Sequence, residues 1–235
     1  MGGAWTLEAG RGLVISSVSA SRTEARFTSE RERADAPLFR KAEIQVLAEY
    51  GITDRFTLRG KGSVEQWRQD GAEPPDHRGF GVQEIGGRFR LIERGGFVAS
   101  TEASLRSTRE DGERGLEGEA RLLGGYGFEI AGRASFVDAQ LGYRLRPEAG
   151  DEIVVDLTFG IRPFDRTLLL FQSFSTVAAG LGETGRPLHD RHEVEASVVF
   201  DLSETMSLQA GLGRTLIGSD ASVEESVFGA LWLRF

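Results

Sequence analysis

Three histidines are the side chains of this chain that titrate nearest neutral pH, so they are the first candidates for catalysis or metal binding. Two of them lie three positions apart in His189-Asp190-Arg191-His192-Glu193, and His77 stands alone. Side chains at that spacing converge on one ligand when a helical turn carries them. No helical periodicity surrounds this segment, so we expect a solvated loop, with no catalytic residue and no metal site.

A glycine-rich segment is the second candidate. Gly180-Leu181-Gly182-Glu183-Thr184-Gly185 matches the glycine spacing of dinucleotide-binding loops. That spacing cradles a pyrophosphate only between a strand and a helix, and here Arg186-Pro187 follows it. We therefore expect a flexible loop and no cofactor. The chain has no cysteine, which excludes a thiolate nucleophile and a disulfide framework.

The third candidate is a set of charged side chains that recur at every second position of otherwise apolar segments. Side chains two positions apart lie on one face of a β-strand. Charges of both signs on one face can pair across neighbouring strands, or line a narrow pore with separated positive and negative walls. The predicted pore-lining residues are Glu43, Glu49, Arg59, Lys61, Arg88, Arg90, Glu102, Glu119, Arg121, Asp138, Arg144, Asp156, Glu193 and Glu195.

The elements that carry these charges are predicted to be strands, because period-two alternation recurs along the chain and helical periodicity is poor. We expect about twelve strands: a first one near Gly12–Ser21, five hairpins, and a last one over Val223–Phe235. The clearest hairpin runs from Ala42 to about Val64. Leu168–Val177 is also expected to be a strand, but the sequence does not indicate which of its faces points inward.

The connections between these strands alternate in expected length. Turns within hairpins are tight, whereas the connections between hairpins are longer and polar: 23–40, 66–78, 107–115, 146–151, 180–191 and 217–222. Long and short connections then lie on opposite rims, and an even number of strands puts both chain ends on the rim of short turns. Bacterial outer-membrane barrels have short periplasmic turns, longer extracellular loops and an even strand number. Residues 1–11 are expected to form a periplasmic N-terminal segment.

Aromatic side chains on the outward faces are expected close to the short turns. They are Tyr50, Phe56, Phe89, Phe97, Tyr126, Phe159, Phe200 and Phe235. Aromatic rings are favoured at the headgroup level of a membrane, so their clustering predicts an interfacial girdle. The same faces carry Gly and Ala among larger apolar residues and are nearly free of charge, which suits lipid contact. A soluble β-barrel or sandwich remains the alternative.

The composition fits this interpretation. The chain has 31 glycines, 6 prolines and a formal net charge of −8. It has no run of about 18 apolar residues, which excludes a transmembrane helix but not barrel strands of about 9–11 residues. The acidic balance argues against nucleic acid as a partner. Met1-Gly2-Gly3-Ala4-Trp5 lacks the charged and apolar regions of a signal peptide, so the sequence predicts either a cytoplasmic protein or a mature chain with an added Met. Arg22–Arg40 is expected to be a solvated loop, with binding of divalent cations or lipopolysaccharide phosphates as the alternative.

Three segments carry a resemblance to a known group of proteins: Ala4-Trp5-Thr6-Leu7-Glu8-Ala9-Gly10-Arg11-Gly12, Glu49-Tyr50-Gly51-Ile52-Thr53-Asp54-Arg55, and the last strand with its terminal Phe235. They resemble Gram-negative outer-membrane β-barrel proteins of the porin-like or transporter type, including the MetA-pathway phenol-degradation group. The resemblance implies outer-membrane lipids and lipopolysaccharide as surroundings. It also implies recognition of the C-terminal strand by the barrel-assembly machinery.

The sequence therefore predicts an all-β protein: one transmembrane, antiparallel, up-and-down β-barrel over residues 1–235, located in the bacterial outer membrane. The predicted function is a narrow passive channel for small hydrophilic or amphipathic solutes, without enzymatic activity. A closed barrel that acts as an anchor or a protein-interaction platform is the first alternative. A lipid-modifying enzyme that uses His189 or His192 is the second.

Overall fold

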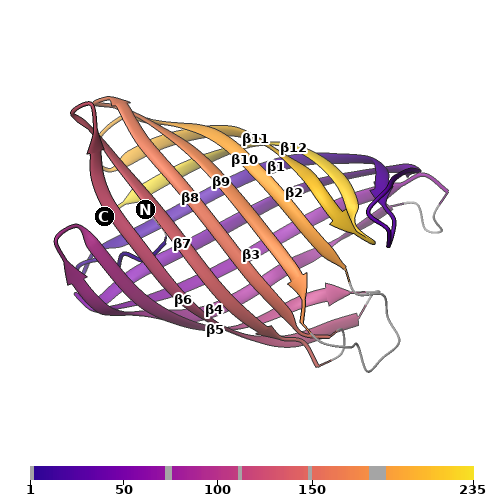
Figure 1. Cartoon of the computed structure of the whole chain (residues 1–235), viewed down its shortest axis with the longest axis horizontal. Coiled ribbons are helices and arrows are strands. Elements are labelled where there is room, and N and C mark those ends of the chain that lie inside the picture. Colours follow the sequence, from indigo (N-terminus) through magenta and orange to yellow (C-terminus); the bar gives the residue numbers. More distant parts are fainter. Residues whose placement is uncertain (1–2, 72–75, 111–112, 148–149, 180–188) are drawn as a thin grey trace.

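The computed structural model describes residues 3–71, 76–110, 113–147, 150–179 and 189–235. In these residues twelve strands form one closed barrel, in which β1 pairs antiparallel with both β2 and β12 (Figure 1). The strands are β1 (Gly12–Phe27), β2 (Arg33–Thr53), β3 (Phe56–Gln69), β4 (Asp76–Arg94), β5 (Phe97–Glu110), β6 (Glu113–Ile130), β7 (Arg133–Leu145), β8 (Glu152–Phe164), β9 (Thr167–Ala178), β10 (Asp190–Asp201), β11 (Met206–Ser219) and β12 (Ser222–Arg234). The prediction of a twelve-stranded, up-and-down, all-β barrel is confirmed. The described residues contain no helix with the length and apolarity needed to cross a membrane.

The barrel is apolar on the outside and charged on the inside. Outward side chains such as Val18, Ile44 and Ile85 are each 60% exposed or more, whereas the inward Arg88 and Glu102 are 2% and 3% exposed. Soluble proteins show the opposite distribution, because they bury apolar residues and leave charged ones in water. The observed distribution is the one that a barrel adopts when lipid contacts its outer face.

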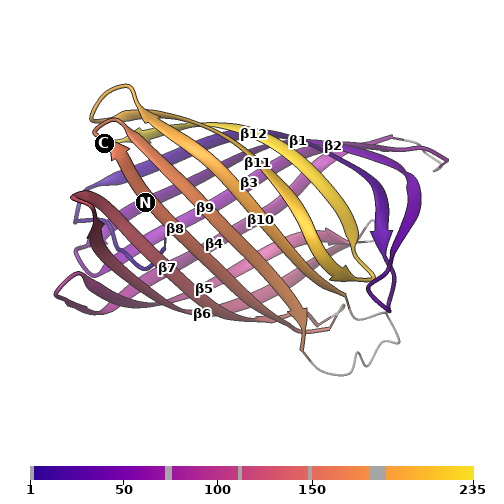
Figure 2. The same ribbon diagram turned by 45° about the horizontal axis from the view of Figure 1, so that its top comes forward.

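The two rims of the barrel differ. The short-turn rim carries the connections 54–55, 95–96, 131–132, 165–166 and 202–205, and both chain ends lie on the same side (Figures 1 and 2). The β4–β5 turn has Gly95 and Gly96 at φ 58° and 83°, the left-handed pair that a two-residue hairpin turn requires. The barrel closes at this rim, where the backbone of Phe235 exchanges hydrogen bonds of 2.8 and 3.1 Å with Gly12.

The opposite, long-loop rim carries the connections 28–32, 70–75, 111–112, 146–151, 179–189 and 220–221. The prediction of long loops at 107–115 and 217–222 is therefore wrong, because the strands there are joined by the short connections 111–112 and 220–221. The expected loop at 23–40 is also mostly strand, since β1 continues to Phe27 and β2 begins at Arg33. Strands that project beyond lipid need no apolar face, so alternation of hydrophobicity could not reveal these extensions.

Most of the predicted girdle aromatics lie exposed beside the short turns. The side chains of Tyr50, Phe89, Phe97 and Tyr126 are between 43% and 46% exposed. Phe97 faces Tyr126 across the β5–β6 ladder, so the rings continue from strand to strand at one height. The uncertain facing of Leu168–Val177 is resolved, because buried Leu168 and Leu170 point into the barrel and exposed Phe171 points out.

Candidate functional site

The candidate site is the interior of the barrel, and its most buried part is a four-membered charge cluster on β2 to β5. The Arg88 Nη2 lies 2.9 Å from Glu102 Oε2 and 3.3 Å from Glu49 Oε1. Arg59 also pairs with Glu102, and its Nε lies 3.9 Å from Glu49 Oε1. Strand register explains the cluster, because Glu49 faces Arg59 across the β2–β3 ladder and Arg88 faces Glu102 across the β4–β5 ladder. Two cations and two carboxylates thus compensate one another where little water reaches them.

A second charge network continues this wall from β6 to β8. Glu119 accepts hydrogen bonds from Arg121 and from Arg144, whose Nε lies 2.6 Å from Glu119 Oε2. Arg121 also reaches Asp156, and Arg144 donates to Glu152 at 2.5 Å. Neighbouring pairs of this network lie on successive strands, so each of these five side chains has a partner of opposite charge.

Further pairs extend the wall toward the long-loop rim. The Lys41 Nζ lies 2.8 Å from Glu43 Oε2 and 3.0 Å from Glu65 Oε2. On the other side of the wall, Arg146 donates to Glu117 at 3.1 Å and pairs with Glu152. Ion pairs therefore recur along the inner face from β2 to β8.

The facing wall, from β9 through β12 to β1, is apolar near the short-turn rim. Its buried cluster consists of Leu13, Leu168, Leu170, Val199, Ala230 and Trp232. The polar edge of Trp232 is satisfied, because its Nε1 donates to Gln209 Oε1 at 2.9 Å. Apolar side chains facing a wall of charges make the interior amphipathic across its width.

The same facing wall carries a group of carboxylates farther toward the long-loop rim. Glu193, Glu195 and Glu224 point inward from β10 and β12, and Thr215 stands between Glu193 and Glu224 in the strand register. Arg191 lies 2.9 Å from Glu193 and 3.7 Å from Glu224. Among the described residues no cation pairs with Glu195. This part of the interior is therefore acidic.

Residues 3–11 enter the barrel at the short-turn rim and lie against its inner face. The Ala4 amide donates to Asp138 Oδ2 at 2.6 Å, and the Ala4 carbonyl accepts from Ser100 Oγ at 2.5 Å. The Trp5 carbonyl accepts from Arg88 Nη1 at 3.1 Å. The Trp5 ring fits over Gly125, where a Cβ atom would come within 2.6 Å of it. The N-terminal segment predicted at 1–11 is thus, from residue 3 onward, part of the mouth of the barrel.

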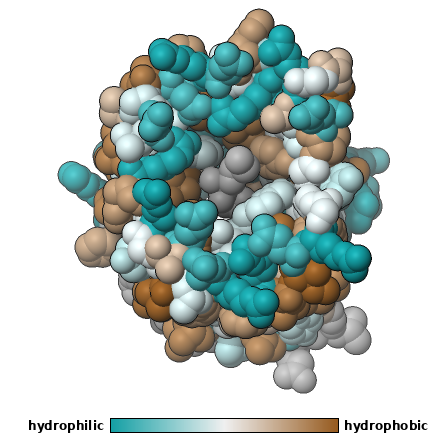
Figure 3. All heavy atoms as spheres, turned by 90° about the vertical axis from the view of Figure 1, so that its left-hand side faces the viewer, coloured by the Kyte–Doolittle hydropathy of each residue, from teal (hydrophilic) through white to brown (hydrophobic). Residues whose placement is uncertain are grey.

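Figure 3 views this mouth from the short-turn rim. Hydrophilic side chains surround a central hollow, while hydrophobic side chains gather on the outer contour. The opening is narrowed on one side by the N-terminal segment, because Ala4 is fully buried and Trp5 packs edge-on against Phe136 at 5.7 Å. A solute that entered the barrel here would pass this segment.

The structure places all fourteen predicted residues on barrel strands, with their side chains on the inner face. Thirteen of them lie within the walls described above. Arg90 lies instead at the mouth, where it pairs at 2.5 Å with the half-exposed Glu93 near the end of β4. That these residues line a pore stays a prediction.

Sequence reasoning missed several members of the charged wall, among them Arg106, Arg146 and Glu152. Arg106 lies 3.4 Å from Glu117, and Arg146 meets the predicted Arg144 at Glu152. All three stand at strand ends beside the connections at 107–115 and 146–151. The alternation that reveals a strand needs apolar neighbours, and these positions have few of them.

The histidine-containing segment begins strand β10 and is not the expected loop. His192 points outward and its Nδ1 lies 2.5 Å from the hydroxyl of Ser175 on β9, whereas His189 Nε2 lies 3.4 Å from Glu152. Among the described residues no carboxylate contacts His192, so the Ser–His pair lacks the third group that orients a catalytic histidine. No cluster of three metal-ligating side chains occurs in the described part of the chain. Residues 180–188, with the glycine-rich motif, and the side chain of His77 lie outside the described part of the chain.

Comparison with known proteins shows similarity in fold. No protein-family model and no curated protein matches the sequence. Among solved structures, the chain is similar to the COG4313 outer membrane channel from Pseudomonas putida F1, with a TM-score of 0.77 and 14% identity over 100% of this chain and 99% of that one. The NanC porin follows with a TM-score of 0.62 and 5% identity, over 93% of this chain and 98% of the porin. The β domain of the Bordetella autotransporter BrkA has a TM-score of 0.55 and 15% identity, over 97% and 100% of the two chains. The resemblance to outer-membrane β-barrels is confirmed at the level of the fold.

Proposed function

We propose that the protein is a narrow, passive outer-membrane channel for small amphipathic solutes. The observation that carries this proposal is the unequal interior, with paired charges on β2 to β8 and an apolar wall centred on Leu168 and Leu170. A solute with one polar and one apolar side could contact both walls without leaving either unsatisfied. The similar proteins that are described as a channel and as a porin give independent support.

The orientation of the barrel in the membrane follows from the lengths of the connections at its two rims. Outer-membrane barrels keep their short turns in the periplasm, so the mouth that contains residues 3–11 would open to the periplasm. The N-terminal segment would then set the narrowest part of the path. Because it donates a hydrogen bond to Asp138 and accepts hydrogen bonds from Ser100 and Arg88, it would restrict the size of the solute.

Cations are expected to be preferred over anions. Arg191 pairs with Glu193 and Glu224, and among the described residues no cation pairs with Glu195, whereas most carboxylates of the opposite wall pair with arginines or with Lys41. Rings or groups of carboxylates favour cations in channels. We expect Glu195→Gln to lower the cation preference, and Glu225→Gln, which changes the outward neighbour of Glu224, to leave it unchanged.

The test is current recording in planar bilayers with protein refolded in detergent. Discrete conductance steps, and a reversal potential in a KCl gradient that indicates cation preference, are expected for the full chain. The refolded state is checked by heat-modifiable migration on a gel. Correctly folded protein that gives no conductance and no solute uptake into liposomes would contradict the channel.

A closed barrel is the second candidate, and one observation favours it. Ala4 is fully buried in the mouth, and the four charges of the cluster on β2 to β5 already pair with one another without a solute. Deletion of residues 3–9 distinguishes the two possibilities. A silent full chain whose deletion variant conducts would be a plugged channel, whereas silence of both variants favours an anchor or interaction platform.

A further inference from the structure

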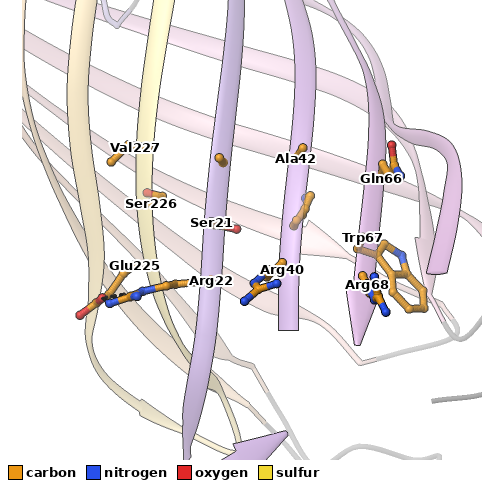
Figure 4. A pocket seen from close by; sticks show the side chains of 12 residues that line it. Ser21, Arg22, Arg40, Ala42, Gln66, Trp67, Arg68, Glu225, Ser226 and Val227 are labelled. Atoms are coloured by element: carbon orange, nitrogen blue, oxygen red, sulfur yellow. Dashed lines mark hydrogen bonds and ion pairs between the residues drawn. The ribbon is translucent and has the colours of Figure 1, made fainter. Parts of the chain in front are cut away.

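The outer face of the barrel carries a row of arginines near the long-loop rim. Arg22 on β1 faces Arg40 on β2, and Arg40 faces Arg68 on β3, each directly across an antiparallel ladder. On the other side of Arg22 stands Glu225 of β12. All four side chains point away from the barrel, and Figure 4 shows them at one height on four adjacent strands.

Without a partner, this row of arginines is expected to destabilise the folded barrel. Like charges that face each other across a ladder destabilise a sheet. Arg22 is compensated, because its Nη2 lies 3.1 Å from Glu225 Oε2. Arg40 has an arginine on each side, and among the described residues no carboxylate pairs with it. The row is therefore expected to have an anionic partner outside the chain.

The surface below the row is a shallow apolar groove. The next outward positions toward the middle of the barrel are Val227, Ala20, Ala42 and Gln66, which face one another in register. The small side chains of the two adjacent alanines leave a depression in the surface, and the groove has a volume of about 800 Å³. Beyond them lie Val18 and Ile44, both 60% exposed. The groove thus joins a cationic end to the apolar outer band.

The dimensions point to a ligand with more than one phosphate. Neighbouring strands are about 4.8 Å apart, so three arginines on three strands span roughly 10 Å. A single phosphate occupies only part of that width. Guanidinium groups bind phosphate through paired hydrogen bonds, which makes arginine the suitable residue for such a headgroup.

We propose that this groove binds the phosphorylated glycolipid of the outer leaflet, lipopolysaccharide. Its phosphates would contact Arg22, Arg40 and Arg68, and one of its acyl chains would lie over Ala20 and Ala42. The assignment to the outer leaflet rests on the orientation proposed above, in which the long-loop rim is extracellular. The site is on the outside of the barrel, so it does not depend on whether the barrel conducts.

The test measures lipid retention by the refolded full chain in a non-ionic detergent. Native mass spectrometry records binding of deep-rough lipopolysaccharide, with phosphatidylglycerol and inorganic phosphate as comparison probes. We expect lipopolysaccharide to bind at lower concentration than either probe. The double variant Arg40→Gln/Arg68→Gln should weaken its binding about tenfold or more, because each lost charge-assisted hydrogen bond weakens binding by at least that order. Arg133→Gln, which changes an exposed arginine of the short-turn rim, should have no effect.

Two further measurements keep the proposal falsifiable. Ala42→Leu fills the groove without changing charge, and it should weaken binding of lipopolysaccharide but not of inorganic phosphate. Without lipid, the double variant should unfold at the same or higher denaturant concentration than the original chain, since like-charge repulsion is removed. The proposal is overturned if phosphatidylglycerol binds as tightly as lipopolysaccharide, if Arg133→Gln weakens binding as much as the double variant, or if Ala42→Leu changes nothing. Conductance is recorded separately, so failure of the channel leaves this result interpretable.

Discussion

Replacement of Arg88 by glutamine should destabilise the barrel strongly. Arg88 is 2% exposed and contacts Glu49 and Glu102, which are themselves almost fully buried. In the variant these two carboxylates keep only Arg59, so one buried negative charge is left without compensation. Removal of one partner from a buried ion pair costs about 3–5 kcal/mol. With a denaturant dependence of about 3 kcal/mol per molar urea, the unfolding midpoint should fall by roughly 1–2 M.

The assay is urea unfolding of the refolded protein in lipid or detergent, followed by loss of heat-modifiable migration. Arg90→Gln is the matched control on the same strand, because Arg90 pairs with the half-exposed Glu93 at the mouth. An exposed pair contributes about 0–1 kcal/mol, so this variant should unfold close to the original chain. A second variant, Arg88→Gln/Glu102→Gln, restores neutrality and should lose less stability than the sum of its single changes. Equal midpoints for Arg88→Gln and Arg90→Gln, or strict additivity in the double variant, would refute the reasoning.

Two further predictions concern the outer face and the mouth. Leu122 is 61% exposed on the outer face in the middle of β6, and Leu122→Arg should destabilise the protein in bilayers by about 2–4 kcal/mol. Ile130→Arg, at the end of β6, should destabilise it by only about 0–1 kcal/mol. Equal effects of the two variants in bilayer unfolding experiments would argue against lipid at this face. Gly51→Ala should loosen the N-terminal segment, because the added Cβ would overlap the carbonyl oxygen of Glu8, whereas Gly124→Ala adds a Cβ with no heavy atom within 4 Å. Faster hydrogen exchange of residues 3–11 in the first variant only is the expected result, and unchanged exchange would mean that the contact at Gly51 does not hold the segment.

The strand plan was predictable because alternation is a local property. Ile44, Val46 and Tyr50 must all face one way when Glu43 and Glu49 face the other, whatever the rest of the chain does. The even number of strands then predicted that both chain ends lie at the same rim, the one that carries the short turns. Where lipid no longer contacts the strand, as at 23–27 and 33–40, the alternation fades and the sequence predicted loops.

The sequence by itself therefore determined the barrel, the outward and inward faces of most strands, and the types of charge inside. Only the tertiary structure decided which charges meet, because partners such as Arg88 and Glu102, or Arg121 and Asp156, are set by the register of several strands together. It also decided that residues 3–11 enter the mouth and that Arg22, Arg40 and Arg68 form one row. The physical reason is that facing follows from neighbours along one strand, whereas contact depends on how strands from distant parts of the chain are aligned in the closed sheet.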